Sequence, residues 1–250
     1  MRLGLLTSVS GRPELTQIVL RHNLEAAEQA LDEQPFPMAV LDLNATPHDF
    51  DGFTWGDGWR YIRGPSEPVS AKLQKGLEEM RGRVDAVMLI DTDNLIHRRY
   101  FSLAESWISA DMVDFMYLRG GHFLNLVPDH PQVGELLYLR PFTMGPGMTI
   151  SARALDFLDW NIWTDERNRL LNSPLLERFN TYPGSPRTTA GDVEYPFSLE
   201  IKTGEQITTW DETLRGIPGS RITEVQQLDR WLEEHYLETA PFLSELITDE

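Results

Sequence analysis

The first 90 residues alternate between short apolar runs and longer stretches with helical periodicity, and this alternation is the strongest constraint on the fold. The run at 86–90, AVMLI, is continuously apolar, as expected of a strand buried on both faces. Strands that alternate with helices predict βαβ units and a mostly parallel sheet. We therefore predict an α/β fold with helices on both faces of a central sheet. The expected strands are 2–7, 38–43, 59–64 and 86–90, and the expected helices are 13–31 and 67–80.

The second half is less regular. Helical patterns cover 102–110 and 164–179, and 149–160 passes from strand into helix. We expect strands at 113–120 and 134–144 joined by a connection at 121–133, and a hairpin around Gly204. Thr223 and Gln226 have the spacing of a capping box that opens a C-terminal helix.

Composition excludes several classes of function. The 250 residues contain no cysteine, which rules out disulfides, thiolate metal sites and cysteine nucleophiles. The net charge of −17 argues against an extended nucleic-acid interface, because such binding depends on neutralising phosphates. The chain has no apolar stretch of about 20 residues and no signal-peptide pattern, so we expect a cytoplasmic protein without a membrane span.

Two aspartates, Asp91 and Asp93, directly follow the apolar run at 86–90. Carboxylates at the end of a buried strand cost free energy unless they are compensated. Mg²⁺ or Mn²⁺ is a suitable partner, because hard oxygen ligands and substrate phosphates hold such ions. This pattern predicts a metal–diphosphate site. The alternative is structural: the pair caps the next helix or pairs with Arg98 or Arg99.

Four segments resemble glycosyltransferases of the GT-A fold, which use nucleotide sugars, and in particular their family 2-like members. VDAVMLIDTDNLI resembles the strand and DXD motif, and SEPVSAKLQKGLEEM resembles the preceding helix with its basic residue. LLTSVSGRPELTQIVL is similar to the first strand and nucleotide-binding loop, and FTMGPGMTISARALDFL to the glycine-containing segment near the sugar. The matches keep the family's order between residues 5 and 158, and SLEIKTGEQITTW is similar to the closing segment of short, soluble phage and bacterial members.

The resemblance implies a single Rossmann-like GT-A domain over residues 1–250. Its nucleotide-binding half would be 1–115, its acceptor-side half 116–215 and its C-terminal helical extension 216–250. It also implies the roles of individual residues. Contacts to the nucleotide, its sugar or its diphosphate fall on Thr7, Ser8, Val9, Arg12, Asp42, Lys72, Asp91, Thr92, Gly145, Gly147 and Lys202, and metal ligation falls on Asp91 and Asp93. For Arg12, Asp42, Lys72, Lys202 and the two glycines, ordinary roles at a helix start, a turn, a helix surface or a strand stay open.

The implied reaction moves a sugar, of hexosyl type, from a nucleotide diphosphate, with UDP favoured, to an acceptor hydroxyl. An inverting enzyme also needs a carboxylate base. Asp165 and Glu166 are the candidates, with Asp192 and Glu194 as rivals. Asp165 and Glu166 would equally suit the first turn of a helix capped by Thr164. Many family members supply a further metal ligand, often histidine, but no histidine lies between Tyr195 and Trp210.

Three other functions remain open from the sequence. A nucleotidyltransferase uses the same paired carboxylates and metal, but many carry a glycine-rich basic loop after the first strand, and TSVSGRP has one glycine and one arginine. A non-catalytic binding module and a phage-type enzyme that glycosylates a modified nucleic-acid base are the others. The acceptor and the oligomeric state are not predicted, although Trp55, Trp59, Trp160 and Trp163 are candidates for stacking on a sugar or base.

Overall fold

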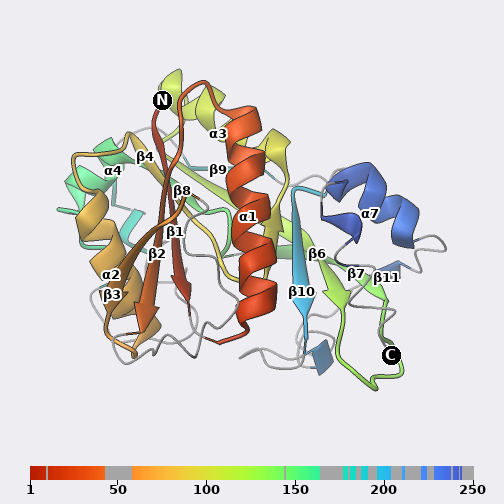
Figure 1. The fold of residues 1–250 in the computed structure, drawn as a ribbon. Coiled ribbons are helices and arrows are strands. Elements are labelled where there is room, and N and C mark those ends of the chain that lie inside the picture. Colours follow the sequence, from red (N-terminus) through yellow and green to blue (C-terminus); the bar gives the residue numbers. More distant parts are fainter. Residues whose placement is uncertain are drawn as a thin grey trace.

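The protein is an α/β structure in which helices cover both faces of a mixed sheet (Figure 1). The structure, a computed structural model, describes residues 1–9, 11–42, 58–143, 145–163, 177–179, 181–183, 187–190, 196–203, 210–211, 221–223, 228–237, 239–241 and 243. The helices are α1 (Pro13–Ala30), α2 (Val69–Met80), α3 (Arg98–Ser109), α4 (Ala152–Phe157) and α7 (Leu228–Tyr236). The strands are β1 (Leu3–Val9), β2 (Phe36–Asp42), β3 (Arg60–Gly64), β4 (Ala86–Leu89), β5 (Asn94–Ile96), β6 (Phe115–Asn125), β7 (Leu136–Thr143), β8 (Thr149–Ser151), β9 (Arg187–Ala190), β10 (Ser198–Lys202) and β11 (Arg221–Thr223).

The sheet is parallel in its first half and largely antiparallel in its second. Its order is β11-β7-β6-β8-β4-β1-β2-β3, and β3, β2, β1 and β4 are mutually parallel as predicted. Beyond β4, the β4–β8, β8–β6, β6–β7 and β7–β11 pairs are antiparallel. A short connection allows only antiparallel pairing, whereas a parallel pair needs a crossover of a dozen or more residues. This accounts for the antiparallel β6–β7 pair, which a short connection joins, whereas β6 pairs in parallel with β9 and β10. The α/β class is confirmed.

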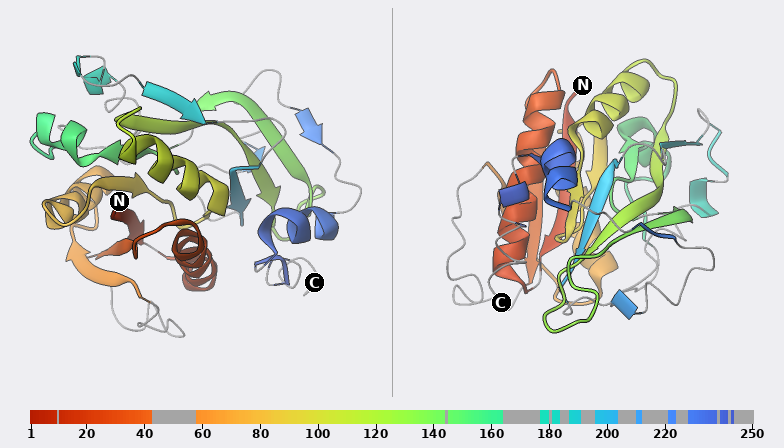
Figure 2. Two further views of the ribbon diagram at one scale, coloured as in Figure 1. Left: turned by 90° about the horizontal axis from the view of Figure 1, so that it is seen from above. Right: turned by 90° about the vertical axis from the view of Figure 1, so that its right-hand side faces the viewer.

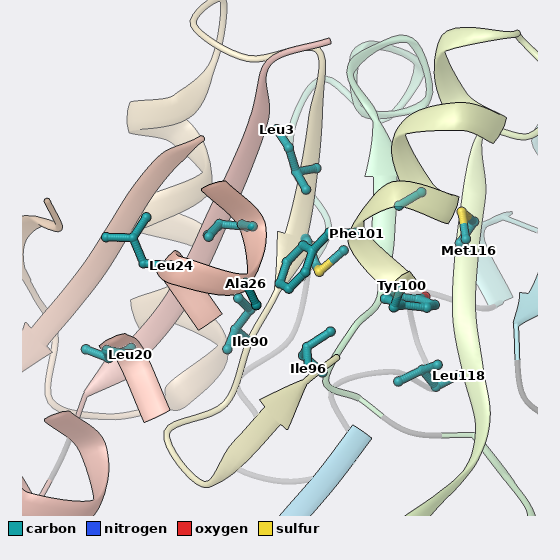
Figure 3. Close-up of a cluster of buried hydrophobic side chains, with 14 of the residues drawn as sticks. Leu3, Leu20, Leu24, Ala26, Ile90, Ile96, Tyr100, Phe101, Met116 and Leu118 are labelled. Atoms are coloured by element: carbon teal, nitrogen blue, oxygen red, sulfur yellow. The ribbon is translucent and has the colours of Figure 1, made fainter. Parts of the chain in front are cut away.

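Two apolar cores lie on opposite faces of the sheet. Leu3 and Leu5 of β1 point into one cluster with residues of α1 and α3, while Leu6 joins the other cluster with Leu73 of α2. Figure 3 shows Tyr100 and Phe101 of α3 in the first cluster. Seen from above, α1 and α2 lie on opposite sides of β1 (Figure 2). This alternation is what a central strand buried on both faces requires.

A third core joins the C-terminal elements to the sheet. It contains Leu95 of β5, Leu199 and Ile201 of β10, and Leu232 and Tyr236 of α7. In Figure 1, α7 lies beside β10, at the side of the molecule away from α2. The cluster holds β10 against β5, which directly follows the two aspartates.

Local patterns misplaced several boundaries. β6 runs on to Asn125 through the glycines at 120–121, where we expected a connection, because its pairing with β7 and β10 outweighs the local turn signal. The strand β5 was not predicted, and α3 begins at Arg98 rather than at residue 102. β10 is confirmed as a strand, but it pairs with β5 and β6, and the second strand of the expected hairpin lies largely outside the described residues. Within the described part of the chain, no helix combines the length and apolarity needed to cross a membrane.

Candidate active site

Several of the predicted site residues lie at one edge of the sheet. Parallel strands end on the same side, so the carboxyl ends of β1, β2 and β4 bring the segments after Val9, Asp42 and Leu89 together. In doubly wound sheets this edge is where ligands bind. In Figure 1 it is the lower edge, where α1 begins.

The end of β1 carries an unsatisfied hydroxyl and a strained turn. Thr7 is fully buried, and its Oγ1 has no hydrogen-bond partner among the described atoms. Gly11 (φ 67°) and Arg12 (φ 48°, ψ 57°) both adopt left-handed backbone immediately before α1. That conformation disfavours a non-glycine residue by about 1–2 kcal/mol, and such strain is concentrated at functional sites. Ser8 is partly buried, and Val9 lies in the core, so only the backbone of Val9 is available to a ligand.

Arg12 bridges the β1 turn to the aspartate motif. Its Nη1 donates to Asp93 Oδ2 at 3.1 Å, and its Nη2 donates to Thr92 Oγ1 at 3.2 Å. For Asp93 the structure shows neither the helix cap nor the Arg98 or Arg99 pair of the structural alternative, and the metal site stays a prediction. Asp93 pairs with Arg12, and α3 is capped instead by His97, whose ring nitrogen accepts from the Arg99 backbone N–H at 3.1 Å.

Negative charge is crowded around Asp91. Desolvation by the surrounding protein, followed by the charges of Asp93 and Glu200, raises the pKa of Asp91 to about 7, while Arg12 and Lys202 act in the opposite direction. The Asp91 residue is exposed, so water offsets part of this desolvation, and the upward direction is what the neighbouring carboxylates dictate. A cation bound here would relieve this repulsion.

The strand β10 adds a carboxylate and an ammonium to the cluster. It is held beside the motif by a hydrogen bond from the Ile201 N–H to the Asp93 carbonyl oxygen at 2.8 Å. Glu200 lies opposite Asn94 in the antiparallel pair, and it forms an ion pair with Lys202. Lys202 is buried, and its Nζ lies 5.7 Å from the centre of the Phe123 ring. Desolvation raises the pKa of Glu200, which the charge of Lys202 opposes.

Glu200 is the member of this cluster that the sequence reasoning missed. A signal was present in SLEIK, where strand alternation puts Glu200 and Lys202 on one face and the apolar Leu199 and Ile201 on the other. What the sequence could not show is that this charged face turns toward Asp91 and Asp93.

The end of β2 supplies a second ion pair. Lys72 of α2 is buried rather than surface-exposed, and its Nζ contacts Asp42 Oδ1. Burial lowers the pKa of Lys72 to about 8. The Asp42 carboxylate favours the charged form, so it limits this decrease, and the ion pair is the state expected at neutral pH.

The two candidate glycines differ. Gly147 has φ 79°, and a Cβ there would lie 2.9 Å from Leu118 Cδ1. Its carbonyl accepts from Tyr100 Oη at 2.7 Å, and its N–H donates to the Leu89 carbonyl oxygen at 2.7 Å, so Gly147 is required by the fold. Gly145 lies outside the left-handed region, and a Cβ there would meet nothing within 4 Å, so there is space beside its Cα.

Three of the candidate tryptophans lie in the apolar cores. Trp59, Trp160 and Trp163 are buried in the two main cores, so the structural interpretation of these rings holds and not the stacking one. Asp165, Glu166, Asp192, Glu194 and Trp55 lie outside the described residues.

The donor set fits a divalent cation that keeps ligands from outside the protein. In the described part of the chain, no group of three or more His, Cys, Asp or Glu side chains is arranged to hold a metal ion. Two carboxylates completed by phosphate oxygens or waters form the usual protein site for Mg²⁺. Asp91 and Asp93, with their mutual repulsion, match that description.

Comparisons with known proteins bear on the fold. No protein-family model matches the chain, and no curated protein matches it. Among solved structures, S. aureus TarS 1–349 is similar with a TM-score of 0.53 and 12% identity, over 80% of this chain and 60% of that one. The same TarS fragment in complex with UDP-GlcNAc gives a TM-score of 0.52 and 13% identity, over 98% and 74% of the two chains. Glucosyl-3-phosphoglycerate synthase from Mycobacterium tuberculosis, in complex with Mn²⁺, UDP and phosphoglyceric acid, gives 0.49 and 9%, over 76% and 68%.

At these identities the likeness concerns the fold alone. It agrees with the α/β class of the sheet and its helices. The chain therefore has an α/β fold of the GT-A type, the nucleotide-diphospho-sugar transferase fold that its motifs predict.

Proposed function

We propose that this protein is a metal-dependent glycosyltransferase that moves a sugar from a nucleotide diphosphate sugar to an acceptor hydroxyl. The observation that carries the proposal is the meeting of Arg12, the Asp91–Asp93 pair and Lys202 at the carboxyl edge of the sheet. These groups have the charges that a metal–diphosphate needs. TarS, which has a similar fold and was crystallised with UDP-GlcNAc, supports a UDP-sugar as the donor, although this chain spans only part of that protein.

Asp91 and Asp93 would hold Mn²⁺ or Mg²⁺. When bound, the ion would supply Lewis-acid stabilisation of the negative charge on the departing diphosphate. Arg12 and Lys202 would add positive charge at the same edge. The Thr7 hydroxyl, which has no hydrogen-bond partner among the described residues, would orient the nucleotide together with Ser8, Thr92 and the Asp42–Lys72 pair.

The reaction breaks the bond between the anomeric carbon and the diphosphate oxygen, and it forms a bond from that carbon to the acceptor oxygen. The electron pair of the broken bond leaves with the diphosphate. In an inverting enzyme the hydroxyl proton passes to a carboxylate, for which Asp165 and Glu166 are our candidates. Gly145, where there is space beside the Cα, would allow the sugar to approach closely.

Thermal-shift measurements with nucleotide sugars test the donor. A ligand that binds the folded state raises the unfolding temperature by mass action. We expect a UDP-sugar to raise the unfolding temperature more with Mn²⁺ than without it. We also expect slow hydrolysis of the UDP-sugar, which releases UDP. Asp93→Asn should abolish the Mn²⁺-dependent part of the temperature increase. Asp159→Asn is the matched control, because Asp159 is exposed, pairs with Arg81 and has a left-handed backbone that asparagine tolerates.

Two outcomes would contradict the proposal. If no UDP-, GDP-, TDP- or CMP-sugar moves the unfolding temperature, the protein does not bind nucleotide sugars. If the protein instead transfers a nucleoside monophosphate from a nucleoside triphosphate, it is a nucleotidyltransferase that uses the same paired carboxylates.

A further inference from the structure

We propose that Arg12 is a positioning residue that occupies Asp93 before the donor binds and moves to the diphosphate when it arrives. The inference rests on the proposed function for its second step only. Its first step, competition between the Arg12 guanidinium and a divalent cation for Asp93, concerns this chain's own residues. Together, the two steps make metal binding and nucleotide binding depend on each other through the Arg12 side chain.

The contact lies on the predicted metal ligand itself. Arg12 Nη1 is 3.1 Å from Asp93 Oδ2, and Nη2 is 3.2 Å from Thr92 Oγ1, between the two aspartates. The side chains of Arg12 and Asp93 are 15% and 12% exposed, so water screens the pair only weakly. A cation that approaches this oxygen meets a like charge and must displace the guanidinium or share the carboxylate with it.

The turn that carries Arg12 is held by hydrogen bonds that are separate from the contact of Arg12 with the aspartate motif. The Arg12 carbonyl accepts from the Thr16 N–H at 2.9 Å, and the Gly11 carbonyl accepts from Thr16 Oγ1 at 3.3 Å. These bonds tie the left-handed turn to the first residues of α1. Because neither bond involves the Arg12 side chain, the guanidinium can leave Asp93 by side-chain rotation while the turn stays in place.

The other cations at this edge have different carboxylate partners. Lys202 pairs with Glu200, and Lys72 pairs with Asp42. A diphosphate offers Arg12 an alternative partner that suits its planar, bidentate donor geometry. When Arg12 moves to it, both oxygens of Asp93 become available to a cation.

This exchange has a signature that a merely structural arginine would lack. Without nucleotide, removing Arg12 should strengthen metal binding, because Asp93 loses its competitor. With nucleotide, the same removal should weaken the coupling between the two ligands, because the diphosphate loses a partner. Linkage requires that any such effect act equally on the affinities of both ligands.

Mn²⁺ binding, followed by the electron paramagnetic resonance of the free ion, tests the inference with and without UDP. Arg12→Asn is the main variant, because asparagine is too short to reach Asp93 and tolerates the left-handed backbone. Arg81→Gln is the matched control: it also removes one positive charge, but its partner Asp159 lies away from the aspartate motif. Thr92→Val keeps the charge and removes only the second contact of Arg12.

Without UDP, we expect Arg12→Asn to bind Mn²⁺ about five-fold or more tightly than the wild type, Thr92→Val to change in the same direction by less, and Arg81→Gln to match the wild type. Adding UDP should tighten Mn²⁺ binding less in Arg12→Asn than in the wild type. Equal or weaker Mn²⁺ binding by Arg12→Asn without UDP, including no binding by either protein, would overturn the inference. Failure to transfer sugar would leave this arm unaffected, so the two proposals fail separately.

Discussion

Replacing Gly147 with alanine should destabilise the protein, whereas the same change two residues earlier should not. Gly147 has φ 79°, and a Cβ built there lies 2.9 Å from Leu118 Cδ1 and 3.3 Å from Tyr100 Cε1. Both neighbours are fully buried, so neither can move aside without disturbing the first core. At Gly145 a Cβ would meet nothing within 4 Å.

The expected loss follows from two terms. The left-handed backbone costs an alanine about 1 kcal/mol relative to glycine. Overpacking against Leu118 and Tyr100 adds about 1–3 kcal/mol. Together they predict a loss of about 2–4 kcal/mol in the free energy of unfolding, which in a chain of this size lowers the melting temperature by roughly 4–16 °C. For Gly145→Ala the change should stay within about 0.5 kcal/mol.

Urea denaturation of both variants, followed by tryptophan fluorescence, measures these losses. The same pair separates structural from functional glycines, because Gly145→Ala should impair UDP-sugar hydrolysis at nearly full stability if the sugar approaches that backbone. Equal stability losses in the two variants would refute the reasoning from backbone conformation and Cβ clearance.

Two further predictions concern pH. Burial, together with the charges of Arg98 and His235, lowers the pKa of His97 to about 4 from 6.5. The neutral ring therefore contributes up to about 3 kcal/mol to the free energy of unfolding. This contribution is fully present above pH 6.5 and is lost as the pH falls toward 4. His97→Asn keeps a capping acceptor for α3, so its urea midpoint should fall less than that of the wild type between pH 7.5 and 4.5; parallel curves would contradict this. Burial lowers the pKa of Lys72 to about 8 from 10.5, so the wild type should gain stability from this group as the pH rises through that range. Lys72→Met should lack this gain, and a constant difference between the two proteins from pH 7.5 to 9.5 would argue against it.

Much of the fold could be read from local patterns. The strands β1, β2, β3 and β4 and the helices α1 and α2 appear within a few residues of their predicted positions. Their signals are periodicities of two or 3.6 residues and helix-start residues such as Pro13, which reflect interactions between near neighbours in the chain. The position of Asp91 and Asp93 at the end of a buried strand was readable for the same reason.

The partners of the site residues were not readable in this way. Arg12 and Asp93 are 81 positions apart, and no local pattern links them. The inclusion of Glu200, the insertion of β5 and the antiparallel half of the sheet likewise depend on pairings between distant strands. The two glycines look alike in sequence, yet the left-handed backbone of Gly147 and its packing against Leu118 and Tyr100 distinguish them.

The sequence by itself determined which segments become strands and helices and where two carboxylates end a strand, because those properties depend on neighbours a few residues away. Tertiary structure alone decided which charges meet at that strand end, that Lys72 is buried and that Arg12 reaches Asp93. The physical reason is that desolvation and ion pairing depend on distance in space, and the topology of the sheet sets that distance.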